Sequence, residues 1–228
     1  MTKKIDLSPA FSTLISSLYP TIDWKKVTLY EGLPWFMPEG SAIAVVLPSA
    51  YSLSHTHIYF KEWNPTSCRR IGILIHEAYH VLQLQSLQKG TGMGMARGFL
   101  MLYFAHYFSN LLHFWKIGNL TKARSQAYFQ HPMEIPAYAQ EDAFRQACYG
   151  FDLSKLAAEN RLSEQDVHQF VQKNPDLIQI QPTQTPHISV IWWGLSIAIA
   201  LSLIFVRPVG DIIFLPLFWA KGKLFGRR

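Results

Sequence analysis

The segment His76-Glu77-Ala78-Tyr79-His80 constrains the fold of this chain more than any other. It lies in an apolar stretch, residues 71–82, that contains no proline and whose pattern predicts an unbroken helix. Side chains four residues apart share one face of a helix, so the imidazoles of His76 and His80 can reach one metal ion. Glu77 can then act as a base without filling a coordination position. The alternative is two ordinary, hydrogen-bonded histidines on a half-buried helix.

Two histidines supply two ligands, whereas a catalytic zinc ion usually has three protein ligands and a water molecule. The third ligand is expected downstream, and Glu134 is the best candidate. A helix tolerates Pro136 only near its start, so Glu134 should lie at or before the first turn. Glu141 is the alternative ligand, because it follows Glu134 by about two helical turns on the same face. If Glu134 binds the metal, Glu141 is expected to orient an imidazole N–H group.

Residues 24–145 resemble a gluzincin-type zinc metallopeptidase, particularly the small, minimal gluzincin-like domains. The H-E-x-x-H motif at 76–80 is the specific part of this resemblance, and predicted short strands precede it as in that family. In gluzincins a glutamate on a second helix, often in an E-x-x-A pattern, completes the metal site. Residues 134–137 match that pattern. The resemblance therefore implies Zn²⁺ held by His76, His80 and Glu134.

The same resemblance implies hydrolysis of peptide bonds in a protein or peptide substrate by a zinc-activated water, with Glu77 as general base. A donor to the developing oxyanion is also required, and the sequence offers four of suitable type: Tyr103, His106, His131 and Tyr138. A catalytically inactive zincin-like protein that binds a partner is the alternative, although the intact Glu77 argues against it. A di-iron oxygenase needs more histidine clusters than this chain contains.

The expected fold class is α+β: a small zincin-like domain in which a short β-sheet covers the H-E-x-x-H helix, with a helical C-terminal part and then a C-terminal membrane helix. Ahead of the motif we expect a helix over 8–19 and strands over 24–30, 41–47 and 57–60. An exposed strand edge could pair with an extended substrate. His55 and His57 would share one face of the last strand, as part of a polar edge strand or as a second metal pair.

The motif helix is expected to begin after Thr66 or Ser67 and to run to about Lys89. Residues 99–115 predict a long aromatic helix whose apolar face packs on the core or lies in the membrane interface. Its polar stripe argues against a full membrane span; it consists of His106, Ser109, Asn110 and His113. Further helices are expected over 121–130 and 137–149 and after Ser163.

The chain is expected to divide into a metallopeptidase-like domain over 1–171, a linker over 172–187 and a membrane anchor over 188–228. Residues 188–206 contain no charged side chain and are long enough for a transmembrane helix. The apolar segment 208–220 contains Pro216 and is too short to span, so it would be re-entrant or interfacial. A basic tail follows it.

The charge distribution indicates the binding partners to expect, and the cysteine content indicates the cellular compartment. Residues 207–228 carry +4 of the chain's net charge of +6, so nothing indicates a nucleic-acid-binding face, and membrane lipid is the expected partner. The basic tail favours a cytoplasmic C-terminus, and the lack of a convincing signal peptide favours a cytoplasmic catalytic domain. Cys68 and Cys148 are far apart in sequence, so we expect two unpaired, buried thiols in a reducing compartment.

Overall fold

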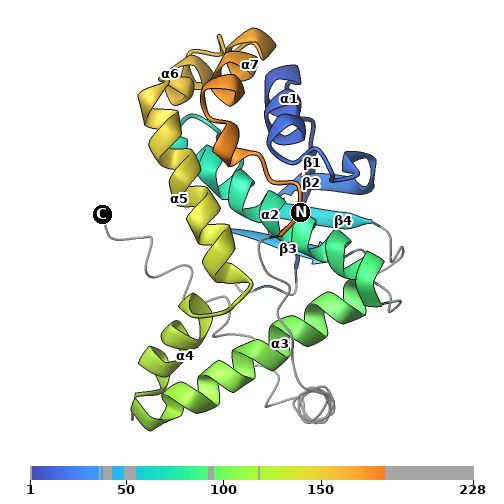
Figure 1. Ribbon diagram of the computed structural model, residues 1–228, viewed down its shortest axis with the longest axis vertical. Coiled ribbons are helices and arrows are strands. Elements are labelled where there is room, and N and C mark those ends of the chain that lie inside the picture. The colour runs from blue at the N-terminus through green and yellow to red at the C-terminus, as the bar shows by residue number, and fades with distance from the viewer. Residues whose placement is uncertain are drawn as a thin grey trace.

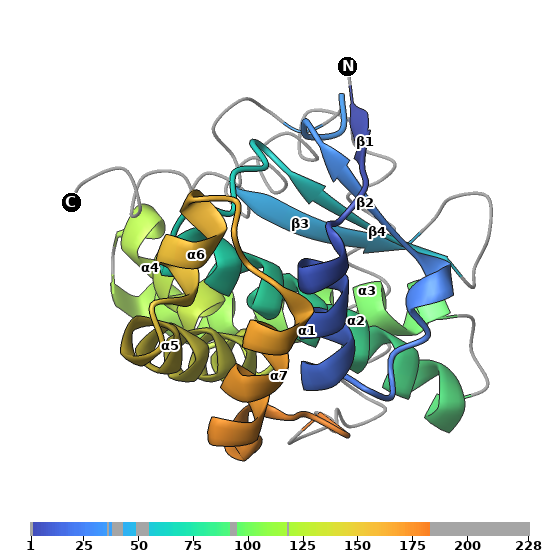
Figure 2. The same ribbon diagram turned by 90° about the horizontal axis from the view of Figure 1, so that it is seen from above.

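The computed structural model describes residues 2–35, 37, 43–48, 55–91, 95–117 and 119–182, and these form an α+β fold with a small sheet. Figure 1 labels the elements, and Figure 2 shows the sheet on one side of the molecule and the helices gathered on the other. The strands are β1 (Lys3–Ile5), β2 (Val27–Glu31), β3 (Ala44–Pro48) and β4 (Thr56–Phe60). The helices are α1 (Pro9–Leu18), α2 (Cys68–Thr91), α3 (Met95–Phe114), α4 (Leu120–Phe129), α5 (Glu134–Gly150), α6 (Leu153–Ala158) and α7 (Glu164–Lys173), with short 3₁₀ turns η1 (Trp24–Lys26), η2 (Trp115–Ile117) and η3 (Pro175–Leu177).

The sheet has the strand order β1-β2-β4-β3, with β2 and β4 parallel and the other neighbours antiparallel. Burial alternates along β4: Ile58 and Phe60 are buried, whereas His57 and Tyr59 are only half-buried on the opposite face. The prediction of a polar edge strand at His57 is therefore wrong, because β4 pairs on both sides and the described edges are β1 and β3. The Nδ1 atom of His57 lies 3.1 Å from the hydroxyl of Tyr59.

Helix α2 forms the centre of the core. Nearly every residue from 71 to 84 is buried, because the sheet, α3 and α5 all pack on this helix. Because the helix is buried on all sides, residues 71–84 are apolar around its whole circumference, apart from a few polar positions. Ser67 caps the helix by accepting a hydrogen bond from the Arg70 N–H group at 3.2 Å, as the sequence predicted.

Helices α2 and α5 pack antiparallel over most of their length. The start of α2 lies against the end of α5, where Cys68 and Cys148 form a disulfide bond. One turn further along α2, Gly72 lets α5 approach closely: a Cβ atom there would lie 3.0 Å from the Arg145 side chain and 3.3 Å from that of Glu141. At the other end of the contact, the side chain of Gln83 donates a hydrogen bond to the carbonyl of Met133 at 2.9 Å.

The expectation of two unpaired cysteines is wrong. The two side chains are buried, as predicted, but they are bonded to each other across the α2–α5 contact. Their separation of 80 residues concealed the pairing, since sequence distance says nothing about which helix ends meet in space. The antiparallel packing brings their Cα atoms to 5.8 Å, within the usual range for a disulfide.

Helices α3 and α4 form a hairpin with its own small core. Tyr107, Ala127 and Tyr128 are buried between the two helices, so the inner face of α3 packs on protein. Asn110, from the polar stripe of α3, donates hydrogen bonds to the carbonyls of Ala127 and Gln130. Among the described helices, α3 included, none combines the length and apolar character needed to cross a membrane. The predicted membrane helix 188–206, segment 208–220 and basic tail lie outside the described residues.

Residues 174–180, within the predicted linker 172–187, lie against the helical part of the domain. The buried Leu177 accepts a hydrogen bond from the side chain of Gln140 at 2.7 Å. The N–H group of Gln179 donates to the carbonyl of Leu18 at 2.7 Å. Close packing of the described chain therefore extends beyond α7.

Removal of the disulfide is expected to destabilise the fold. The bond closes a long loop, and such crosslinks contribute roughly 2–5 kcal/mol by restricting the unfolded chain. The double variant Cys68→Ala/Cys148→Ala should lose about this much unfolding free energy in urea denaturation of detergent-purified protein. Reductant should bring the wild type close to the variant and leave the variant unchanged. Equal stability of both proteins under oxidising conditions would contradict the prediction.

Candidate metal centre

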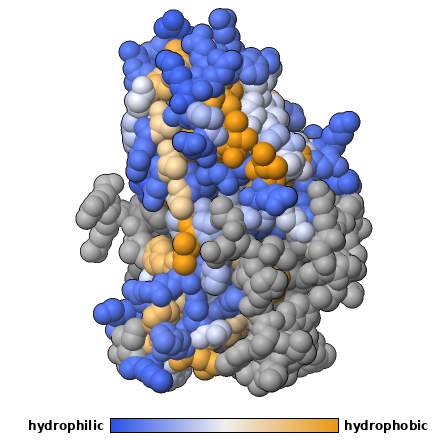
Figure 3. Space-filling view, viewed as in Figure 1, coloured by the Kyte–Doolittle hydropathy of each residue, from blue (hydrophilic) through white to orange (hydrophobic). Residues whose placement is uncertain are grey.

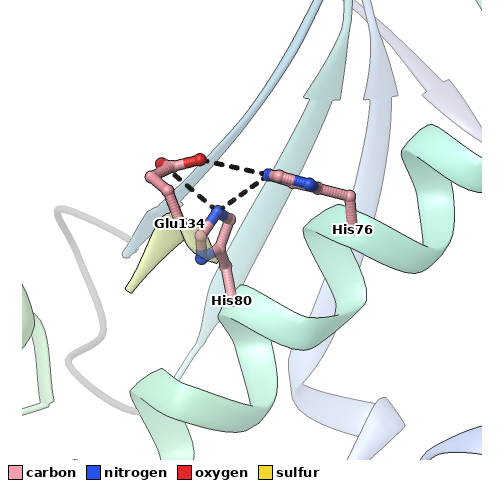
Figure 4. Close-up of side chains that lie close together, drawn as sticks. All are labelled: His76, His80 and Glu134. Carbon is pink, nitrogen blue, oxygen red and sulfur yellow. Dashed lines mark hydrogen bonds and ion pairs between the residues drawn. The ribbon is translucent and has the colours of Figure 1, made fainter. Parts of the chain in front are cut away.

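His76, His80 and Glu134 meet between α2 and α5, as Figure 4 shows. The two histidines lie one turn apart on α2, and Glu134 is the first residue of α5. All three side chains are buried, with Glu134 only 2% exposed. In the part of the chain that the structure describes, this is the one group of three such side chains close enough to share a metal ion.

The distances within this group fit a metal site. The Nε2 atoms of the two histidines are 3.1 Å apart. The Glu134 carboxylate lies 3.3 Å from His76 Nε2 and 3.5 Å from His80 Nε2. Ligands placed 2.0–2.1 Å from a tetrahedral ion are about 3.3 Å from one another. Each histidine faces a different oxygen of the Glu134 carboxylate, and the spacing of the three residues suits a shared metal ion.

Gln83 fixes the orientation of the His80 ring. Its side-chain N–H group donates to the carbonyl of Met133, so its oxygen is directed to His80 Nδ1 at 2.9 Å. His80 must then carry its proton on Nδ1, which leaves the Nε2 lone pair directed at the shared point. Contacts of this kind set the tautomer of metal-binding histidines.

Glu141 holds the other imidazole. Its Oε2 atom lies 3.2 Å from His76 Nδ1, on the side of the ring away from Glu134. The atoms are close enough for an ion pair, although they are not aligned as a hydrogen bond. The structure thus brings Glu134 to the imidazole nitrogens that face the shared point, and it places Glu141 behind the His76 ring.

Two tyrosines hold the Glu134 carboxylate. The Tyr103 hydroxyl donates to Oε1 at 2.8 Å, and the Tyr128 hydroxyl donates to Oε2 at 2.9 Å. Burial, followed by the nearby Glu134 charge, raises the pKa of both tyrosines well above the usual value. Both hydroxyls therefore keep their protons, and the carboxylate is fixed by residues from α3 and α4.

Glu77 lies beside the metal-binding group at the edge of a pocket. The side chain is buried, and it lines the pocket together with His76 and Tyr138. The other lining residues are Ile43, Arg69, Ile73 and Glu141. Ile43 immediately precedes β3, so the pocket lies between an edge strand of the sheet and the motif helix.

The structure separates the four candidates for the oxyanion donor. Tyr138 lines the pocket, and its ring packs edge-on against that of His76 at 4.7 Å between centroids. Tyr103 donates its hydroxyl to Glu134. His131 uses both ring nitrogens on backbone groups, at Tyr103 and Met133, and burial lowers its pKa to about 4. His106 packs against His131, and burial lowers its pKa also.

Two supporting residues were not predicted from the sequence: Gln83, which holds His80, and Tyr128, which holds Glu134. Gln83 lies three residues after His80, a spacing at which helical side chains meet, so the sequence contained a signal for it. Tyr128 had no such signal, because its position depends on how the α3–α4 hairpin folds back on α5.

Comparison with known proteins finds no family model that matches the chain, and it finds no similar curated protein or solved structure. The resemblance to gluzincins therefore stays a prediction from the motif residues, because a group of two histidines and one glutamate does not by itself identify that family.

Loss of the Glu141 carboxylate should weaken metal binding. Glu141→Gln keeps the shape of the side chain but removes the charge behind His76, and loss of such a supporting contact typically costs 10- to 100-fold in metal affinity. Competition with a chromogenic chelator measures this change. The matched control is Asp142→Asn, because that neighbouring carboxylate is 67% exposed and faces Arg145. Equal affinity of the two variants would show that Glu141 does not support the site.

Proposed function

We propose that this protein is a zinc-dependent metallopeptidase of gluzincin type. The observation that carries the proposal is the position of Glu77, which lines a pocket next to the His76–His80–Glu134 group. A structural metal site has no need of a further buried carboxylate that lines a pocket beside the metal ligands. A metal-assisted hydrolase needs a base at this place.

Zinc is the metal that these residues suit best. Two imidazoles and one carboxylate are the protein ligands of one class of catalytic zinc sites, which keep the fourth position open for water. When bound, zinc supplies Lewis acidity, which lowers the pKa of a water molecule and polarises the carbonyl of the scissile peptide bond. The donors contain no sulfur, so the site has no preference for softer metals.

The protein's own groups move the proton. Glu77 accepts a proton from the attacking water as the new C–O bond forms, and it delivers that proton to the leaving amine nitrogen as the C–N bond breaks. The Tyr138 hydroxyl is the donor that we assign to the oxyanion, because Tyr138 lines the pocket and its hydroxyl makes a long hydrogen bond, 3.4 Å to the Tyr128 hydroxyl. Tyr103 and His131 are held by shorter hydrogen bonds to other groups. Gln83 and Glu141 keep the imidazoles in place throughout.

The pocket suits an extended peptide. Strand β3 is an edge of the described sheet, and Ile43 at its start forms one wall of the pocket. A substrate backbone can add to such an edge by main-chain hydrogen bonds, which bind peptides with little regard to sequence. The apolar side chains of Ile43 and Ile73 then offer a surface for one substrate side chain.

The alternative is an inactive zincin-like protein that binds a partner at this pocket. It would need neither the Glu77 carboxylate nor the paired support of His76 and His80 by Glu141 and Gln83. Glu77 lines the pocket, and Glu141 and Gln83 contact the two histidines, so hydrolysis is the better proposal.

Membrane anchoring through 188–206 is a further part of the proposal, and it depends on sequence alone. The Cys68–Cys148 disulfide is typical of oxidising compartments, which favours a catalytic domain on the non-cytoplasmic face rather than the cytoplasmic one. A single span over 188–206 would then leave the basic tail in the cytoplasm, as the positive-inside rule expects. We therefore propose a membrane-bound peptidase with its domain outside the cytoplasm.

Glu77→Gln is expected to abolish peptide hydrolysis while zinc stays bound. Loss of a general base typically lowers turnover by about 10²- to 10⁴-fold, and Glu77 is not a ligand of the metal. Cleavage of a peptide mixture, followed by mass spectrometry beside zinc content, checks both statements. Glu159→Gln, a change at an exposed glutamate, is the control. Undiminished cleavage by zinc-loaded Glu77→Gln would rule out Glu77 as the base.

A further inference from the structure

The end of the α3–α4 hairpin exposes large apolar side chains. Leu112, Trp115 and Leu120 are 53%, 59% and 40% exposed. They come from three consecutive elements, the end of α3, the turn η2 and the start of α4, and they lie within nine residues of sequence. We call these three residues, together with Lys116 and Lys122, the hairpin tip. Isolated exposed apolar residues are common, whereas a cluster at one turn indicates a binding surface.

The tip lies in a part of the chain without negative charge. Between Glu77 and Glu134 the sequence contains no aspartate or glutamate. The same stretch contains five basic side chains: Lys89, Arg97, Lys116, Lys122 and Arg124. Lys116 and Lys122 are exposed within the tip itself. Exposed apolar and basic side chains therefore alternate along residues 112–122, with no acid in the sequence between them.

The position of the tip suits contact with a large, flat partner. Figure 1 shows the α3–α4 hairpin at one end of the molecule and α6 and α7 at the opposite end. Figure 3 shows hydrophobic patches among hydrophilic ones at the hairpin end. A surface at the end of an elongated hairpin can approach a plane before the rest of the molecule meets it.

We propose that the hairpin tip docks into the surface of a lipid bilayer that contains anionic lipid. Trp is enriched at the headgroup level of membranes, and leucines enter the boundary with the acyl chains. Lysines beside them are attracted to anionic headgroups, by an amount that grows with each lysine. This combination of one Trp, two Leu and flanking Lys matches the chemistry of a membrane interface.

Charge argues against two other occupants. A second copy of this chain would bring an equally basic tip to the first and would be repelled. The chain's own C-terminal residues 207–228 carry a net charge of +4, so they are repelled as well. An anionic bilayer is the partner whose charge complements the tip.

The docking proposal stands apart from the proposed peptidase activity, since no residue of the tip belongs to the metal site. If both hold, the tip would fix the pocket at a constant height above the bilayer. Substrates would then be chains that lie close to the membrane.

A fluorescent label at position 115 tests the proposal. The chain has no cysteine beyond the buried pair, so Trp115→Cys introduces a single free thiol for an NBD label. The labelled full chain is placed in vesicles of phosphatidylcholine with 30% phosphatidylglycerol, and in phosphatidylcholine alone. We expect a blue shift and quenching by spin-labelled lipid in the anionic vesicles, and much weaker effects in the neutral ones. Retained zinc binding and helical circular dichroism check that the labelled protein is folded.

Two further variants make the result specific. Ala158→Cys at the exposed end of α6 should keep its label in water in both vesicles. Lys116→Glu/Lys122→Glu in the Trp115→Cys protein should lower the ratio of docked to undocked label by at least about tenfold in the anionic vesicles. A label at 115 that behaves as the one at 158 would overturn the proposal, and so would equal docking in neutral vesicles. Neither outcome depends on hydrolysis, so failure here leaves the proposed function untouched.

Discussion

The antiparallel contact between α2 and α5 is the interaction on which the rest of the structure depends. It places Glu134 opposite the two histidines and Glu141 behind one of them. It also brings Cys68 to Cys148, and Gly72 permits the close approach in between. A shift of one helix along the other by a single turn would separate all of these pairs at once. The disulfide therefore supports the geometry of the metal-binding group as well as the stability of the fold.

This contact buries ionisable groups that would be costly without compensation. Glu77, Glu134 and Glu141 are all buried close to two imidazoles. Isolated carboxylates in such surroundings are strongly destabilising unless they are paired and hydrogen-bonded. Two tyrosine hydroxyls and the imidazoles compensate Glu134, and a divalent cation would compensate the group as a whole. Burial of three carboxylates in one place therefore does not favour folding, and such costly burial of ionisable groups is typical of functional sites.

Local sequence patterns predicted the helices and strands better than they predicted which of these elements pack or pair with one another. The helix at 8–19, a cap at Thr66 or Ser67 and the place of Glu134 at the first turn of a helix were predicted, because each depends on neighbouring residues such as Pro136. Helix α5 begins three residues earlier than the predicted 137–149. The internal position of β4 and the disulfide were missed, because each depends on which distant segments meet. Of the site, helical spacing predicted His76, Glu77 and His80 as one unit, and Glu141 as a second contact. Tyr128 depends on the fold of the α3–α4 hairpin and could not be predicted.

Metal content is the direct test of our proposal that His76, His80 and Glu134 bind one zinc ion. Mass spectrometry on detergent-purified protein would compare the wild type with Glu134→Ala and with Glu159→Ala, a change at an exposed glutamate. We expect about one zinc per chain in the wild type and in the control, and a large loss in Glu134→Ala. A wild type without zinc, or undiminished zinc in Glu134→Ala, would contradict it.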